Sequence, residues 1–244
     1  MLNTQLRRGI AMIELIFAIV IMGIVLMSAP MLVSQASKSG LVMVQQEAIA
    51  AASTNIGMIL TRQWDENDTN ESIESPILVT NGSAELNEAT DADGNKTGRR
   101  AGTPILSYRS FLTSLGGRLN ASSTLGAENG DDDDIDDFNG QTITLGTPLA
   151  TDATTTAVGD YADTSLQLAT TVSYISDTPS SGNYNSSSMT FNSPFTSAAA
   201  GTTNIKAVST TVTSGSHDAE LDTNITLRAF SCNIGTYQLE ERSF

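Results

Sequence analysis

Residues 7–33 read RRGIAMIELIFAIVIMGIVLMSAPMLV, and this stretch decides how the chain is organised. Within it, residues 15–33 contain no charged side chain. A helix of that length, at about 1.5 Å per residue, is about 28 Å long, which is close to the hydrocarbon thickness of a bilayer. Arg7 and Arg8 come just before it, and positive charges stay on the cytoplasmic side of a membrane. The stretch therefore predicts one transmembrane helix, with a cytoplasmic N-terminus and the remainder of the chain exported.

A cleaved secretory signal is the main alternative for this stretch. Ser34, Gln35 and Ala36 form a small-x-small sequence after which a signal peptidase can cut. Against this alternative, the apolar region is longer than the roughly 7–15 residues typical of such signals, and it would contain Glu14. A carboxylate within an apolar helix costs about 2.5–3.5 kcal/mol on insertion scales, so its presence calls for a function.

The order of residues around Glu14 resembles the signature of type IV prepilins. That signature is a short basic leader ending in glycine, then an apolar residue, and then glutamate as the fifth residue after the cleavage point. Here Gly9 ends the leader, Ile10 becomes the first residue and Glu14 is the fifth. Gly23 also falls where pilin helices commonly carry glycine. The resemblance is specific, and it is confined to the N-terminal helix.

The resemblance implies a processing step and an assembly step. A prepilin peptidase would cut after Gly9, and the new N-terminus at Ile10 would be methylated. Glu14 would then neutralise the N-terminal ammonium of a neighbouring subunit as the helices pack into a filament. The implied partners are other pilin or pseudopilin subunits, the peptidase, an inner-membrane assembly platform and, before assembly, membrane lipid. The implied location is the bacterial inner membrane, crossed once, with the head in the periplasm or, in a pilus, on the cell surface.

The chain divides into a leader at 1–9, a transmembrane or filament-core helix at 10–33, an amphipathic continuation of that helix at 34–66 and a β-rich head at 67–244. Apolar side chains recur at helical spacing between residues 41 and 60. This pattern predicts a helix that continues to Trp64 and packs an Ala/Ile stripe on a sheet, with Met58 and Trp64 in the core. We expect an α+β fold, in which a long hydrophobic helix packs on an antiparallel β-sheet with long polar loops.

Alternating apolar residues in the head predict strands near residues 143–145, 166–174, 208–212, 225–227 and 234–239. A hairpin is expected at 77–82, where Asn81 and Gly82 follow an apolar run, and a short helix is expected at 108–115. The polar segments predicted to be loops are 121–140, 148–164 and 177–204.

The composition excludes several classes of function. The 27 acidic and 12 basic residues give a formal net charge of −15, whereas a nucleic-acid binder needs a basic surface, so no nucleic-acid partner is expected. A single Cys and a single His exclude an internal disulfide, a Cys-based zinc site and a multi-His metal centre. The sequence offers no nucleophile–base pair and no phosphate-binding loop, so we expect a structural protein rather than an enzyme.

Acidic side chains concentrate in one segment of the head, at Asp131, Asp132, Asp133, Asp134, Asp136 and Asp137, with Asn139 close behind. A hard cation such as Ca²⁺ takes about six to eight oxygen ligands, which such a segment can supply. The segment is therefore a candidate Ca²⁺ site. The alternative is a mobile, solvated acidic loop whose charges repel one another. Asp91 and Asp93 form a second, shorter candidate.

Four asparagines lie in the pattern Asp-x-Asn-x-Ser/Thr, which resembles the extended acceptor of some bacterial N-glycosylation systems: Asn67, Asn70, Asn95 and Asn224. A chain so rich in these residues also produces such matches by chance. Cys232 has no second cysteine to pair with, and the absence of a C-terminal disulfide favours a minor pilin or a pseudopilin.

The function that these observations favour is that of a structural subunit. It would be a minor pilin or a pseudopilin, in a type IV pilus or in the filament of a type II secretion system. The alternative is a single-pass membrane-anchored or secreted β-rich domain for binding or adhesion. The two differ in whether the chain polymerises.

Overall fold

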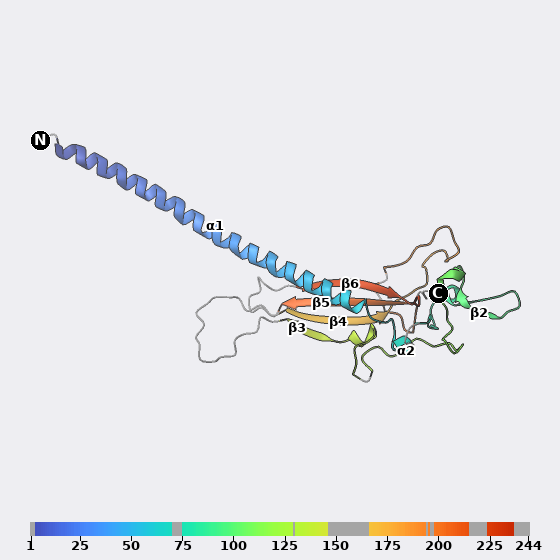
Figure 1. Cartoon of the computed structure of the whole chain (residues 1–244). Coiled ribbons are helices and arrows are strands. Elements are labelled where there is room, and N and C mark those ends of the chain that lie inside the picture. The colour runs from blue at the N-terminus through green and yellow to red at the C-terminus, as the bar shows by residue number, and fades with distance from the viewer. Residues whose placement is uncertain are drawn as a thin grey trace, which may run out of the picture. The chain divides into compact units, whose positions relative to one another are not determined.

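The computed structural model of the protein describes residues 3–69, 75–128, 130–145, 166–193, 195, 198–214 and 224–236. Side chains are described from residue 12 onward, except that of Ile105. The chain forms two compact units, Met1–Glu47 and Ala48–Phe244, and each is described by itself (Figure 1).

The first unit is the N-terminal part of helix α1, which extends from Asn3 to Ile59 and passes Pro30 without interruption. Every residue from 12 to 40 is exposed, and most of those up to Val33 are apolar. By its length and composition the helix is able to cross a membrane. A long apolar N-terminal helix is thus present, as the sequence predicts.

The prediction that α1 continues to Trp64 is wrong. The helix ends at Ile59, where a tighter turn begins, because the N–H of Arg62 donates to the carbonyl of Ile59 at 3.0 Å. The carbonyl of Gln63 then accepts a hydrogen bond of 3.0 Å from the N–H of Ile135, in the acidic segment. A backbone pairing with a distant part of the chain therefore takes these residues out of the helix.

The head contains a four-stranded antiparallel sheet in the order β3-β4-β5-β6. Its strands are β3 (Thr142–Leu145), β4 (Leu166–Tyr174), β5 (Ile205–Ser214) and β6 (Asn224–Cys232). The predicted strands in these four regions are confirmed. Strands β4 and β5 pair along their whole overlap, with Leu166 opposite Ser214 and Tyr174 opposite Lys206. The α+β class is therefore confirmed.

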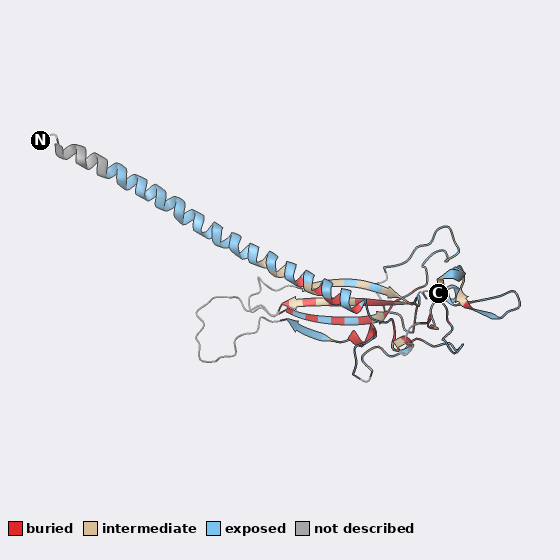
Figure 2. Cartoon of the chain, viewed as in Figure 1, coloured by how far each residue is buried: buried red, intermediate tan, exposed pale blue. Residues whose placement is uncertain are grey.

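One face of this sheet carries the core of the head. Burial alternates along β4, so that every second side chain from Leu166 to Tyr174 is buried. The last turns of α1 add Ala52, Ile56 and Ile59 to the same core (Figure 2). The predicted Ala/Ile stripe is thus confirmed where α1 belongs to the head.

A polar side chain holds the helix on the sheet. Asn55 is buried, and its Nδ2 donates to the hydroxyls of Thr170 and Thr210 at 3.0 and 3.2 Å. Buried amides need such partners, so these bonds fix how the helix is turned toward the sheet. Trp64 is buried as predicted, but Met58 is exposed, and its assignment to the core is wrong.

The remaining elements are α2 (Glu66–Thr69), β1 (Glu88–Thr90), β2 (Lys96–Arg100) and three 3-10 turns, η1 (Ala84–Leu86), η2 (Ile105–Ser107) and η3 (Asp136–Phe138). The hairpin is β1–β2 and not 77–82, because Val79 instead forms a parallel bridge with Asn120. The helix predicted at 108–115 is absent, as is a strand at 234–236, while 237–239 lie outside the described residues.

Two neighbouring residues of the helix end allow a direct test of this packing. Ile59→Ala should lower the free energy of unfolding by about 2–5 kcal/mol, because Ile59 is 0% exposed and the substitution leaves a cavity. Leu60→Ala should cost less than about 1 kcal/mol, since Leu60 is 37% exposed. Denaturant unfolding of the full chain in detergent measures both changes. Equal losses of unfolding free energy would contradict the burial of Ile59 and the exposure of Leu60.

Candidate functional site

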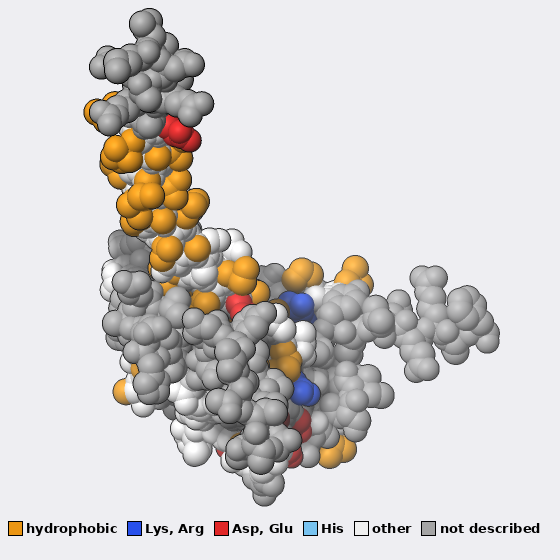
Figure 3. Space-filling model, turned by 90° about the vertical axis from the view of Figure 1, so that its left-hand side faces the viewer, with side chains coloured by type: hydrophobic (Ala, Val, Ile, Leu, Met, Phe, Trp, Pro, Cys, Tyr) orange, Lys and Arg blue, Asp and Glu red, His pale blue; other side chains and the backbone are white. Residues whose placement is uncertain are grey.

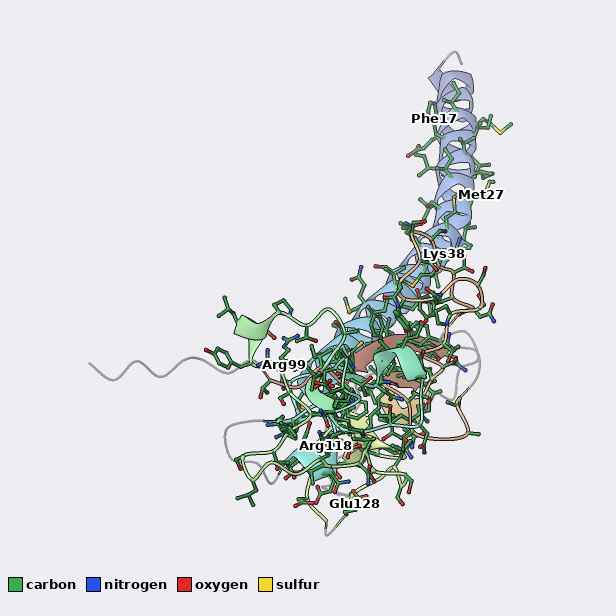
Figure 4. The ribbon with its side chains drawn as sticks, turned by 90° about the vertical axis from the view of Figure 1, so that its right-hand side faces the viewer. Phe17, Met27, Lys38, Arg99, Arg118 and Glu128 are labelled. Atoms are coloured by element: carbon green, nitrogen blue, oxygen red, sulfur yellow. The ribbon has the colours of Figure 1, made fainter. Side chains whose placement is uncertain are left out.

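The residues of the predicted processing and assembly site lie at the start of α1. Gly9 and Ile10 are helical, and Glu14 is exposed. The residues after Glu14 present hydrophobic atoms on the surface of the helix (Figure 3). Phe17 and Met27 project from the ribbon with exposed fractions of 64% and 81% (Figure 4). Such a continuous apolar surface is stable only against lipid or against other subunits.

A second polar centre lies inside the head, where Lys206, Asp65 and Asp136 form a lysine network with every side chain 0% exposed. Lys206 Nζ donates to Asp65 Oδ2 at 2.8 Å, to the carbonyl of Trp64 at 2.8 Å and to Asp136 Oδ1. The rings of Trp64 and Tyr174 lie 4.4 and 5.3 Å from Nζ. These rings add a favourable cation–π contact to the ion pairs.

The two carboxylates of the lysine network have different surroundings. Asp65 also accepts hydrogen bonds from the Tyr174 hydroxyl at 3.1 Å and from the N–H of Ser122 at 3.0 Å. Asp136 has an Oδ2 without a hydrogen-bond partner among the described residues. Burial raises the pKa of the Asp136 carboxyl, and the charge of Lys206 opposes that shift. Asp65 thus has more hydrogen-bond donors around it than Asp136 has.

The second half of the acidic segment is folded into the head, unlike the solvated loop that was the alternative prediction, whereas Asp131, Asp132 and Asp133 are exposed. Asp134, Asp136 and Asp137 are at most 1% exposed. Asp134 Oδ1 accepts from the N–H groups of Asp136 and Asp137 at 2.6 and 3.2 Å. Asp137 Oδ2 in turn accepts from the N–H groups of Asp133 and Asp134 at 2.9 and 3.0 Å. These reciprocal bonds fix the turn and leave one oxygen of Asp134 and one of Asp137 free.

Asp134 and Asp137 belong to two overlapping groups of carboxylates, which together we call the carboxylate cluster: Glu66, Asp131, Asp133, Asp134 and Asp137. Ligand atoms of Glu66, Asp133 and Asp134 lie within 4.8 Å of one another, as do those of Asp131, Asp133 and Asp137. Burial raises the pKa of Glu66, and the charges of Asp133 and Asp131 raise it further. Burial, followed by contact with Asp136, raises the pKa of Asp134 to about 9.

No family model, curated protein or solved structure matches this chain. Its function is therefore inferred from the residues themselves and from their geometry. Sequence reasoning missed Lys206, Asp65 and Glu66, because each becomes significant only through a contact with a distant segment. Lys206 lies just before the strand predicted at 208–212, and its neighbours Ile205 and Ala207 give no sign of its buried partners.

Other predicted metal ligands have different roles in the structure. The Oδ1 of Asn139 accepts from the N–H of Val172 at 3.0 Å, which ties η3 to β4. Asp132 is exposed and accepts from Gln141 Nε2 at 2.6 Å. In the second acidic candidate, Asp91 Oδ1 accepts from the N–H groups of Asp93 and Asn95 at 3.0 and 2.8 Å, closing the β1–β2 turn. These carboxylate and amide oxygens already have partners.

The predicted glycosylation residues are scattered over the head. Asn95 is exposed in the β1–β2 turn, and Asn224 is exposed at the start of β6. The Nδ2 of Asn67 donates to the carbonyl of Asn120 at 3.0 Å, so the nitrogen that would carry a glycan is engaged. Asn70 lies outside the described residues. Cys232 is half-buried at the end of β6, and burial raises the pKa of its thiol.

Proposed function

We propose that the protein is a pilin-like structural subunit, a minor pilin or a pseudopilin, of a type IV pilus or a type II secretion filament. The observation that carries the proposal is the order Gly9, Ile10, Glu14 at the start of an exposed apolar helix. Cleavage after Gly9 would create an α-amino group at Ile10. Such a group is largely protonated at neutral pH, which makes it a suitable partner for Glu14 of a neighbouring subunit.

The physical chemistry of α1 supports assembly. In a bilayer the Glu14 carboxylate has no partner among the described residues, and a charge at that place is costly. When the helix packs against that of another subunit, the carboxylate can pair with the N-terminal ammonium group of that subunit. The apolar side chains then contact protein in place of lipid. The Glu14 carboxylate is thus unfavourable in the bilayer and stabilising only in the assembled state.

The end of α1 anchors the helix in the head. Ala48, Ala52, Ile56 and Ile59 are buried in the head, and Asn55 is hydrogen-bonded to two strands. The segment that would lie in a filament core therefore continues, without a break in the helix, into the core of the head.

Processing gives the direct test of the proposal. In a bacterium that expresses a prepilin peptidase, the mature chain should begin at Ile10 and carry a methylated amino group, which N-terminal peptide mass spectrometry detects. Gly9→Val should block the cut, since it changes the last residue of the leader, whereas Gly23→Ala in the same helix should leave it intact. A mature start at Ser37 would instead identify a secreted domain and refute the proposal.

A further inference from the structure

The carboxylate cluster gathers five acidic side chains, and none of them forms an ion pair in the described part of the chain. We propose that it is a Ca²⁺ site, formed by Glu66, Asp131, Asp133, Asp134 and Asp137. This inference concerns the head alone and does not depend on whether the chain assembles into a filament.

The unpartnered oxygens in the cluster are the first argument. Asp134 is 0% exposed and Asp137 is 1% exposed, yet Asp134 Oδ2 and Asp137 Oδ1 have no hydrogen-bond partner among the described residues. Glu66 Oε2 is likewise buried and unpartnered. A buried carboxylate oxygen without a donor or a cation is strongly unfavourable. Glu66 and Asp134 belong to one group of carboxylates whose ligand atoms lie within 4.8 Å of one another, and Asp137 belongs to a second group that shares Asp133. Unpartnered buried oxygens in both groups indicate a missing ligand.

The nearby basic side chains form no ion pair with the cluster in the described part of the chain, although the charge of Arg62 acts on Asp133. Lys206 is the buried cation of this region, and its ion pairs are made with Asp65 and Asp136. In the described part of the chain, no ion pair reaches Asp134 or Asp137. A cation bound in the cluster would supply the ion pairs that the described residues do not.

The spacing and chemistry of the ligands fit Ca²⁺. Two oxygens on opposite sides of a Ca²⁺ ion, each about 2.4 Å from it, are about 4.8 Å apart. The ligand atoms of each triplet lie within 4.8 Å of one another, and Asp133 belongs to both triplets. All the groups are carboxylates, which select hard cations rather than Zn²⁺ or Cu²⁺. Mg²⁺ demands a stricter octahedral geometry and retains its water, so Ca²⁺ fits this irregular set better.

Binding would join two parts of the head that the sequence separates widely. Glu66 opens α2 just after the end of α1, whereas the four aspartates lie in the segment that leads through η3 to β3. The two parts already meet through the pairing of Gln63 with the acidic segment. A shared ion would lock this junction beside the point where the helix enters the head.

Terbium luminescence on the full chain in detergent tests the site directly. Tb³⁺ takes the same oxygen ligands as Ca²⁺, and Trp64, the only tryptophan, is close in sequence to Glu66 and can sensitise its emission. We expect sensitised emission that saturates and that Ca²⁺ displaces at much lower concentration than Mg²⁺. In the same sample, Ca²⁺ at about 100 times its Kd should raise the unfolding temperature by about 5–10 °C over chelator.

Matched substitutions locate the ion. Asp131→Asn combined with Asp133→Asn should abolish the emission and the thermal shift, and both residues are exposed, so the fold should persist. The control is Asp91→Asn combined with Asp93→Asn, an equal loss of exposed charge in the β1–β2 turn, and it should keep both signals. Absence of Ca²⁺-displaceable emission in the wild-type chain, or its retention in the first variant, would overturn the inference.

Discussion

Lys206→Met should lower the free energy of unfolding by about 3–5 kcal/mol, the cost of breaking a buried ion pair by removing one partner. Methionine nearly preserves the volume of the side chain, so the loss is electrostatic rather than a cavity effect. Without the ammonium group, Asp65 and Asp136 are left buried with no positive partner in the lysine network. The change also removes the hydrogen bond from Nζ to the carbonyl of Trp64.

An exposed lysine of the same head supplies the control. Lys96 Nζ lies 3.8 Å from Glu88 Oε2 and its side chain is 59% exposed, so Lys96→Met should cost no more than about 1 kcal/mol. Denaturant unfolding of the full chain in detergent, followed by circular dichroism of the sheet, compares the two variants. Adding Asp136→Asn to Lys206→Met should recover part of the loss, because it removes one of the stranded charges. A Lys206→Met variant as stable as the wild type would contradict the closed, buried network.

The lysine network could not be predicted from the sequence, whereas the main elements of the fold could. The four strands of the main sheet and the buried stripe on α1 were predictable, because alternation and helical spacing are local patterns that burial imposes directly. The pairing of Lys206 with Asp65 and Asp136 joins three segments that are far apart along the chain. Nothing local to Lys206 distinguishes it from an exposed strand lysine.

For the acidic segment, the sequence predicted too little burial. A run of aspartates predicts a solvated loop on composition, yet Asp134, Asp136 and Asp137 are buried. The side chains of Asp134 and Asp137 accept hydrogen bonds from backbone N–H groups of the same turn, and Asp136 pairs with Lys206 of β5. The predicted end of α1 at Trp64 was wrong for a related reason. Gln63 pairs with the acidic segment, and α1 therefore ends at Ile59.

Glu14→Val is the substitution with the largest expected effect on assembly. Insertion into the membrane should persist, because the change removes a charge that is costly in lipid. Incorporation into a filament should fall by at least about tenfold, since losing one partner of a buried hydrogen-bonded charge pair costs about 2–5 kcal/mol. Glu47→Val, which removes the same charge from an exposed position of the same helix, should assemble as the wild type does.

The central measurement is therefore the recovery of tagged full-length protein with other pilin-like subunits, after chemical cross-linking in a bacterium that expresses the assembly machinery. Mass spectrometry of the purified adducts gives the partners, and immunoblotting of membranes gives the amount inserted. We predict that wild type and Glu47→Val recover subunits carrying the same kind of leader, and that Glu14→Val, inserted equally, recovers few or none. Equal recovery by Glu14→Val, or no such subunits with the wild type, would contradict the assignment of this chain to a pilin-like filament.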